Sequence, residues 1–168
     1  MSMQLPPSLR ALLVAVPLAL CGASSLGGCT KTTIPNTDVE DSSENRKVID
    51  FCEKYRRAVE ERDVDALMGM ASSRYFETGG NAKSSDDIDF AGLRTYLSTK
   101  FKMTKAIRYE IRYRRVSVTE TKVINVDYTY TASFLIPTTN GDHWNRAVRE
   151  NRLQLLREGD TYKILGGM

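Results

Sequence analysis

The 168-residue sequence predicts an α+β fold. Between residues 46 and 101 the apolar residues recur every three or four positions, which is typical of amphipathic helices. From about residue 106 onward they alternate with polar residues, which is typical of strands. Turn signals such as Asn140-Gly141 separate the alternating segments and indicate antiparallel pairing. We therefore expect three N-terminal helices packed on one face of a strongly curved antiparallel sheet.

The helices are predicted from the spacing of their apolar residues. The first covers residues 46–61, because one face of this segment is apolar and the other is charged. Its apolar positions are Val48, Cys52, Tyr55 and Val59. Asp63 is placed to cap a short second helix. Acidic residues at 86–89 precede a third helix, and its apolar positions are Phe90, Leu93, Leu97 and Phe101.

Four strands are predicted in the second half of the chain. The first covers residues 107–118, and its alternation changes phase at Arg114-Arg115, which indicates a β-bulge. The second covers residues 124–136, the third about 144–157 and the last 161–165. The first three are longer than an average strand, so we expect the sheet to twist and curl strongly.

The first 28 residues have the form of a secretory signal. Arg10 is their only charged residue, and the apolar run over residues 11–20 is followed by small residues. A membrane-spanning helix needs about 20 apolar residues. The apolar run is shorter and contains Pro17, so we do not expect a transmembrane segment.

Leu26-Gly27-Gly28-Cys29 resembles the lipobox of bacterial lipoprotein precursors. This resemblance implies cleavage before Cys29, a diacylglyceryl group on its sulfur and, in most family members, an acylated amino end. The alternative is an ordinary signal peptide followed by a chance cysteine. Thr30 stands where lipoproteins kept in the inner membrane tend to carry Asp, so the resemblance favours the outer membrane, with the domain facing the periplasm.

Composition divides the chain into three parts. Residues 1–28 form the expected signal peptide, and residues 29–46 the expected lipidated cysteine and flexible tether. The tether is rich in Thr, Ser and acids and has few large apolar residues to bury. Residues 47–168 form one expected folded domain.

The sequence contains no motif for a cofactor or a metal. His143 is the only histidine, and the sequence has no Cys-x-x-Cys pair and no glycine-rich phosphate loop. Cys52 lies on an apolar helical face, so we expect a buried hydrophobic residue rather than a catalytic thiol. We therefore expect no cofactor and no metal. The expected export of the protein also excludes nucleic acid as a partner.

The domain resembles the NTF2-like superfamily, which includes SnoaL-type cyclases and ketosteroid isomerase. The resemblance rests on Tyr55, on residues 62–67, on Tyr75-Phe76 and on residues 159–164, in that order. It implies a cone-shaped α+β domain with an interior cavity. A cystatin-like α+β fold is the alternative.

The resemblance also implies candidate catalytic residues. In the ketosteroid isomerase branch, a helical tyrosine donates to an oxyanion, and a carboxylate sixteen residues after a helical Asp is the base. Tyr55 and Asp63 match the tyrosine and the Asp, but the position of the base falls on Gly79. Glu77 is the nearest acid, so Tyr55 and Glu77 are weak candidates, and the sequence favours binding over catalysis.

Three functions follow from this interpretation. The first is the binding of a small apolar ligand inside the cone, or of an envelope protein on the sheet face. The expected cavity residues are Tyr55, Tyr109, Tyr128, Tyr130 and Phe134. The second is an isomerase-like or cyclase-like enzyme that uses Tyr55 and Glu77. The third is a structural adaptor that dimerises within an envelope assembly.

Basic residues outnumber acidic ones between Lys100 and Arg115. Arg108, Arg112 and Arg114 are expected to form a basic patch on the sheet face turned away from the helices. Such a patch would contact an anionic envelope surface. The alternative is a solvated face with acidic residues nearby.

Overall fold

The computed structural model describes residues 31–78 and 86–168, which belong to one compact unit, Lys31–Met168. The expected signal peptide and Cys29 lie outside the described residues. None of the described helices is both long enough and apolar enough to cross a membrane.

Three helices occur among the described residues. They are α1 (Ser43–Glu61), α2 (Val64–Met70) and α3 (Phe90–Lys102). Helix α1 begins three residues earlier than predicted, because the Ser42 side chain accepts a hydrogen bond from the backbone of Asn45 and caps the first turn. Asp63 caps α2 as predicted, and Asp89 caps α3.

The main sheet has four antiparallel strands in the order β3-β4-β5-β6. They are β3 (Ala106–Val118), β4 (Ile124–Thr138), β5 (Gly141–Glu158) and β6 (Thr161–Gly166). The predicted bulge is confirmed, because the β3–β4 register shifts between Tyr113 and Arg115. A second, two-stranded pairing joins β1 (Phe76–Glu77) to β2 (Ile88–Asp89).

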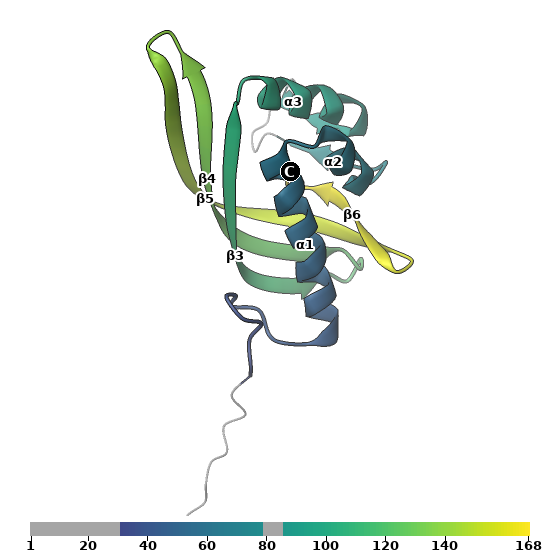
Figure 1. Cartoon of the computed structure of the whole chain (residues 1–168). Helices are drawn as coiled ribbons and strands as arrows, with labels where there is room; N and C mark the ends of the chain where they lie inside the picture. The colour runs from purple at the N-terminus through teal and green to yellow at the C-terminus, as the bar shows by residue number, and fades with distance from the viewer. Residues whose placement is uncertain (1–30, 79–85) are drawn as a thin grey trace, which may run out of the picture. The chain divides into compact units, whose positions relative to one another are not determined.

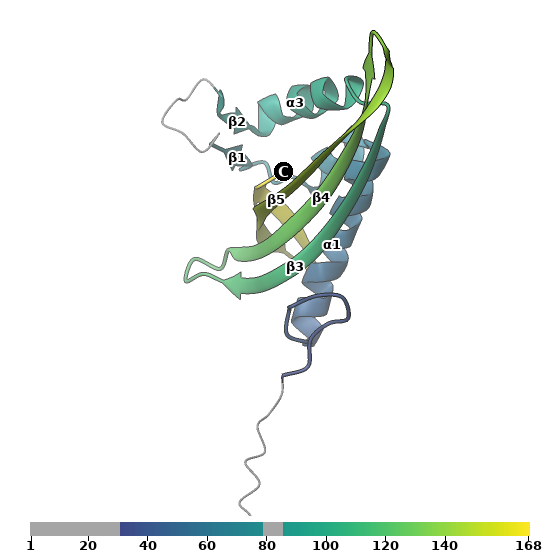
Figure 2. The same ribbon diagram turned by 90° about the vertical axis from the view of Figure 1, so that its left-hand side faces the viewer.

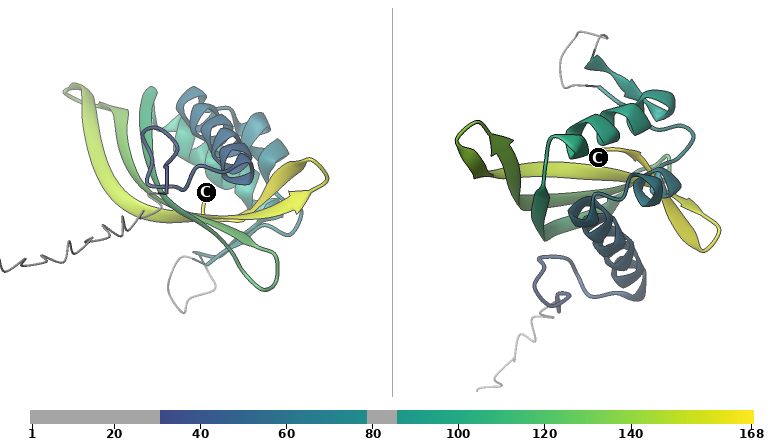
Figure 3. Two further views of the ribbon diagram at one scale, coloured as in Figure 1. Left: turned by 90° about the horizontal axis from the view of Figure 1, so that it is seen from below. Right: turned by 45° about the horizontal axis from the view of Figure 1, so that its top comes forward.

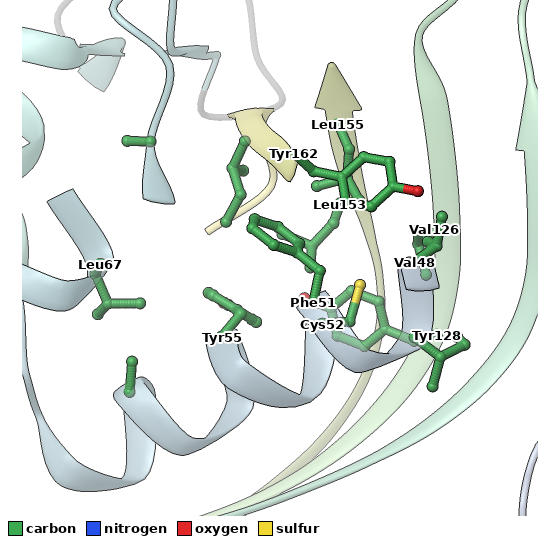
Figure 4. Packing of buried hydrophobic residues seen from close by; sticks show 14 of the residues in the cluster. Val48, Phe51, Cys52, Tyr55, Leu67, Val126, Tyr128, Leu153, Leu155 and Tyr162 are labelled. Carbon is green, nitrogen blue, oxygen red and sulfur yellow. The ribbon is translucent and has the colours of Figure 1, made fainter. Parts of the chain in front are cut away.

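The three helices lie on one face of the four-stranded sheet, and the sheet curves around them (Figures 1 and 3). The bend of β3, β4 and β5 is clearest from the side (Figure 2). The hydrophobic core lies between the two layers. Figure 4 shows Phe51, Cys52 and Tyr55 of α1 packed toward Leu153 of β5 and Tyr128 of β4. Cys52 is buried, as predicted.

Helix α1 also covers the free edge of the sheet, because β3 is an edge strand. The carboxylate of Glu60 accepts a hydrogen bond from the backbone N–H of Tyr109 at 2.8 Å, and Arg56 donates to the Tyr109 carbonyl at 3.1 Å. These contacts satisfy backbone groups that an edge strand otherwise leaves unpaired. They fix the strand that carries Tyr109 against the helix that carries Tyr55.

The structure differs from the expected flexible tether over its described part, because the residues from Lys31 onward belong to the same compact unit as the domain. Thr33 pairs with Glu40 in an isolated bridge, and Val39 is buried in the core. The backbone N–H of Asp38 donates to the carbonyl of Tyr113 on β3 at 2.9 Å. The polar composition of the segment does not predict this arrangement, because burial of Val39 and one hydrogen bond to the edge strand β3 are sufficient to hold the segment.

Candidate functional site

A cavity of about 640 Å³ lies between the three helices and the concave face of the sheet. Its volume falls within the range of small-molecule sites, roughly 300–1,000 Å³. Aromatic and aliphatic side chains supply most of its wall. The helices contribute Tyr55, Val59, Leu67, Tyr96, Leu97, Lys100 and Phe101. The sheet and the end of the chain contribute Tyr109, Tyr130, Phe134, Arg149, Asn151 and Met168.

Four of the five predicted cavity residues line this space: Tyr55, Tyr109, Tyr130 and Phe134. The fifth, Tyr128, is not among the residues that line it. Its side chain is only 1% exposed and packs in the core below α1 (Figure 4). It alternates inward like Tyr130, but it lies nearer the start of β4, where it is buried in the core with residues of α1.

The hydroxyls of Tyr55, Tyr109 and Tyr128 lie close together beside the cavity. The rings of Tyr55 and Tyr109 meet edge to face, with their centroids 6.4 Å apart. Burial, followed by the neighbouring Tyr128 and Tyr109 hydroxyls, raises the pKa of Tyr55 well above its ordinary value. Burial likewise raises the pKa of Tyr109 to about 12. These hydroxyls are therefore protonated at neutral pH and can donate hydrogen bonds.

Asn151 connects this cluster to the end of the chain. Its side-chain amide donates to the Tyr128 hydroxyl at 3.0 Å and to the carbonyl of Gly167 at 3.1 Å. Gly167 precedes Met168, which lines the cavity. The last residues of the chain are thereby held at the cavity wall.

Two cations line the cavity from different elements. Lys100 lies in the last turn of α3, with its ammonium 5.5 Å from the centre of the Tyr96 ring. Arg149 lies on β5 directly opposite Tyr130 of β4, so both residues share the inner face of the sheet. Sequence analysis did not assign either residue to the cavity.

Glu77 is absent from the described residues that line the cavity. Its carboxylate accepts hydrogen bonds from the backbone N–H of Gly167 and, at 3.5 Å, from the Tyr75 hydroxyl. The Tyr75 hydroxyl in turn accepts from the backbone N–H of Met168 at 3.4 Å. Glu77 therefore fastens the end of the chain and does not face Tyr55 across the cavity, in contrast to the catalytic pairing expected from the resemblance.

Arg108, Arg112 and Arg114, the residues of the expected basic patch, lie on β3, and two of them share an acidic counter-ion. Arg112 and Arg114 both bind the carboxylate of Asp38, at 2.6 and 2.8 Å. The hydrogen bonds from Arg112 and then Arg114 lower the pKa of Asp38. Arg108 lies 4.6 Å from the centre of the Trp144 ring. The alternative interpretation, a solvated face with acids nearby, describes Arg112 and Arg114 better than a free anion-binding patch.

Within residues 31–78 and 86–168, no group of three or more His, Cys, Asp or Glu side chains is arranged to hold a metal ion. His143 is exposed near the β4–β5 turn, where it pairs with Ile136. Burial raises the pKa of the Cys52 thiol, so this cysteine is not activated as a nucleophile.

Comparison with protein-family models gave no match, and comparison with curated protein sequences gave none either. Solved structures do match. A candidate aromatic ring hydroxylase from Novosphingobium aromaticivorans has a TM-score of 0.62 at 14% identity, over 76% of this chain and 89% of that chain. ActVI-ORFA from Streptomyces coelicolor has a TM-score of 0.59 at 11% identity, over 74% and 94%.

A third match is a candidate dehydratase of the NTF2-like family from Streptomyces avermitilis. Its TM-score is 0.58 at 13% identity, over 73% of this chain and 92% of that chain. The described chain therefore has the NTF2-like fold, with helices on a curved antiparallel sheet, and the cystatin-like alternative is set aside. At this level of identity the likeness defines the fold alone.

Proposed function

We propose that this chain is a membrane-anchored envelope lipoprotein whose NTF2-like domain binds a small apolar ligand in the cavity without catalysing a reaction. The observation that carries the proposal is the cavity itself, because about 640 Å³ of space is walled mainly by aromatic and aliphatic side chains. A core that only needed to be stable would fill such a space with its own side chains.

The chemistry of the wall supports binding rather than catalysis. The described residues that line the cavity include no aspartate and no glutamate. An isomerase-like or cyclase-like reaction needs a group that accepts a proton. Glu77, the candidate for this role, is engaged by Gly167 and Tyr75. Tyr55 has a raised pKa, so it donates hydrogen bonds and does not act as a base at neutral pH.

Binding is tested with a chain that begins at Lys31, because the compact unit and its core are contained in Lys31–Met168. The probe is N-phenyl-1-naphthylamine, an uncharged apolar fluorophore. We expect saturable binding of one probe per chain. Val59→Phe fills part of the cavity and should weaken binding, whereas Val118→Phe, at a position exposed on β3, should not.

Two results would contradict the binding proposal. One is fluorescence that rises with probe concentration without saturation. The other is equal affinity in the two phenylalanine variants, provided that circular dichroism shows both to be folded. Native mass spectrometry of the same chain reports any ligand that co-purifies with it.

The membrane anchor is proposed from the lipobox resemblance at Cys29. We expect the full-length chain, expressed in a bacterium, to incorporate labelled palmitate and to fractionate with the outer membrane. Cys29→Ser should abolish both, and Cys21→Ser, within the signal segment, is the matched control. Incorporation of label into the Cys29→Ser chain, or its normal processing, would exclude this anchor.

A protein partner on the outer sheet face is the second candidate function. Trp144 and Val148 are large apolar residues exposed on β5, and their alternation places both on the face away from the helices. A homodimer or an envelope partner would cover them. Native mass spectrometry distinguishes a dimer from a monomer, and Trp144→Ala should shift that equilibrium if this face forms the contact.

A further inference from the structure

We infer that the cavity selects apolar ligands that carry one negative charge, which Arg149 and Lys100 bind. This inference rests on the proposed binding function and adds the chemical class of the ligand. The inference is based on two cations that line the same mainly aromatic cavity. Lys100 comes from α3 and Arg149 from β5.

The cations at the cavity have no counter-ion among the described residues. Neither Lys100 nor Arg149 forms a salt bridge with a described acidic side chain, and the described lining contains no Asp or Glu. On the opposite face of the sheet, Asp127 binds Arg115 at 2.8 Å and Arg152 at 2.6 Å. Asp127 thus pairs two arginines on the outer face, whereas Arg149 on the inner face has no such partner among the described residues.

The neutral polar groups of the wall add to the same electrostatic preference. Tyr55 and Tyr109 keep their protons at neutral pH, because burial raises the pKa of each hydroxyl. The Asn151 amide N–H groups are engaged by the Tyr128 hydroxyl and the Gly167 carbonyl, so they hold the wall in place. A wall with protonated tyrosine hydroxyls, two cations and no described carboxylate favours an anion over a neutral or cationic group.

The remainder of the wall specifies an apolar body for this ligand. Val59, Leu67 and Phe134 line the cavity from elements that carry neither Lys100 nor Arg149, and Leu97 and Phe101 add apolar surface from α3. A smaller hollow of about 300 Å³ shares Lys100, Phe101 and Phe134 with the main cavity and is otherwise lined mostly by apolar side chains. The ligand class is therefore an amphipathic acid with an aromatic or branched hydrocarbon body and a single anionic group.

A matched pair of fluorophores isolates the charge. 8-Anilinonaphthalene-1-sulfonate has the ring skeleton of N-phenyl-1-naphthylamine plus one sulfonate. We expect the Lys31–Met168 chain to bind the sulfonate about tenfold more tightly than the neutral probe, as one charge-assisted contact supplies. Added salt should reduce this difference, because the two cations are exposed enough to be screened.

Three variants locate the contact. Arg149→Gln and Lys100→Gln should each weaken sulfonate binding by roughly fivefold to tenfold and change binding of the neutral probe by less than about twofold. Arg146→Gln is the matched control, since Arg146 lies on the same strand three residues away but on the outer face. It should leave the affinity for both probes unchanged.

Each outcome decides between the two claims. Equal affinity of the unsubstituted chain for both probes, or sulfonate binding that is the same in Arg149→Gln as in Arg146→Gln, would overturn the inference and leave the apolar binding function intact. Failure of both probes to bind would overturn the binding function itself. Thermal unfolding of each variant checks that the folded state is retained.

Discussion

The hydroxyl of Tyr113 on β3 donates a hydrogen bond to the carboxylate of Glu53 on α1, with 2.9 Å between the two oxygens. Tyr113 is buried, and its pKa is raised, first by burial and then by Cys52 and the neighbouring Glu53. Glu53 also accepts from Arg56 at 2.8 Å. The contact therefore joins the first helix to the edge strand on the side of the sheet that holds the cavity.

Tyr113→Phe should lower the free energy of unfolding by about 1–2 kcal/mol, because the substitution removes a hydrogen bond to a charged group and leaves the ring in place. Urea denaturation measures the change. Tyr96→Phe is the control, because Tyr96 is exposed on α3, and should cost much less. Equal losses in the two variants would mean that the bond to Glu53 does not contribute to stability.

Asp38→Asn should release the segment before α1 and uncover two arginines. The carboxylate that binds Arg112 and Arg114 is lost, so the amide of Val39 should exchange hydrogen faster and the chain should be retained more strongly on anionic vesicles. Asp65→Asn, whose carboxylate binds Arg94 on α3, is the control. Vesicle retention that does not rise in Asp38→Asn would show that Asp38 does not mask the basic face.

The ion pairs of Asp38 with Arg112 and Arg114 should be lost at low pH. The folded pKa of Asp38 lies below its ordinary value of 3.8, so the contact is fully present above about pH 4. It is lost as the pH falls through the lowered folded pKa. Exchange at Val39 in the unsubstituted chain should therefore rise toward that of Asp38→Asn only in this acidic range, and a convergence near neutral pH would contradict this assignment.

Alkaline titration should separate the buried tyrosines from the exposed ones. The folded pKa values of Tyr55, Tyr109 and Tyr128 are raised above the unfolded value near 10, and that of Tyr109 is about 12. Their contribution to stability is complete below pH 10 and is lost as the pH rises through the folded values. Phenolate absorbance should therefore rise in two steps, the second coinciding with unfolding by circular dichroism. A single step near pH 10 in the folded chain would contradict this.

Gly167→Ala should be strongly destabilising. Gly167 has a φ of +92°, and a Cβ there would collide with the carbonyl oxygen of Arg152. The chain end would have to move, which would break its bonds to Asn151 and Glu77. Thermal unfolding should occur several degrees lower, and the neutral probe should bind more weakly. Gly69→Ala, in α2 with open space around the position, should be neutral or slightly stabilising.

The fold was predictable because local patterns and tertiary contacts agree. Asp63 caps α2, and the phase change at Arg114-Arg115 is the bulge seen in the β3–β4 register. The ordered segment before α1 was not predictable, because its order depends on Val39 and Asp38 meeting β3 from far along the chain. The composition of a segment indicates how much apolar surface it can bury on average, but it does not predict a single tertiary contact such as this one.

The site was predictable only in part. Alternation correctly places Tyr109 and Tyr130 on the inner face, but it cannot distinguish a residue at the cavity from one below α1, as for Tyr128. Arg149 could have been found, because it lies an even number of residues before Leu153 and therefore shares its inward face. The position of Glu77 depends on the end of the chain returning to β1, which no local pattern encodes.

Lys31, whose ammonium binds the carboxylate of Glu40 at 2.9 Å, lies two residues from Cys29, which changes what acylation of Cys29 would imply for the domain's position. Two residues span at most about 7 Å when fully extended. If Cys29 were acylated, this short connection would hold the folded domain next to the phospholipid headgroups. The domain could not diffuse away from the bilayer surface. Its rotation would be restricted, and amphipathic molecules concentrated at that bilayer surface would be the first solutes it meets.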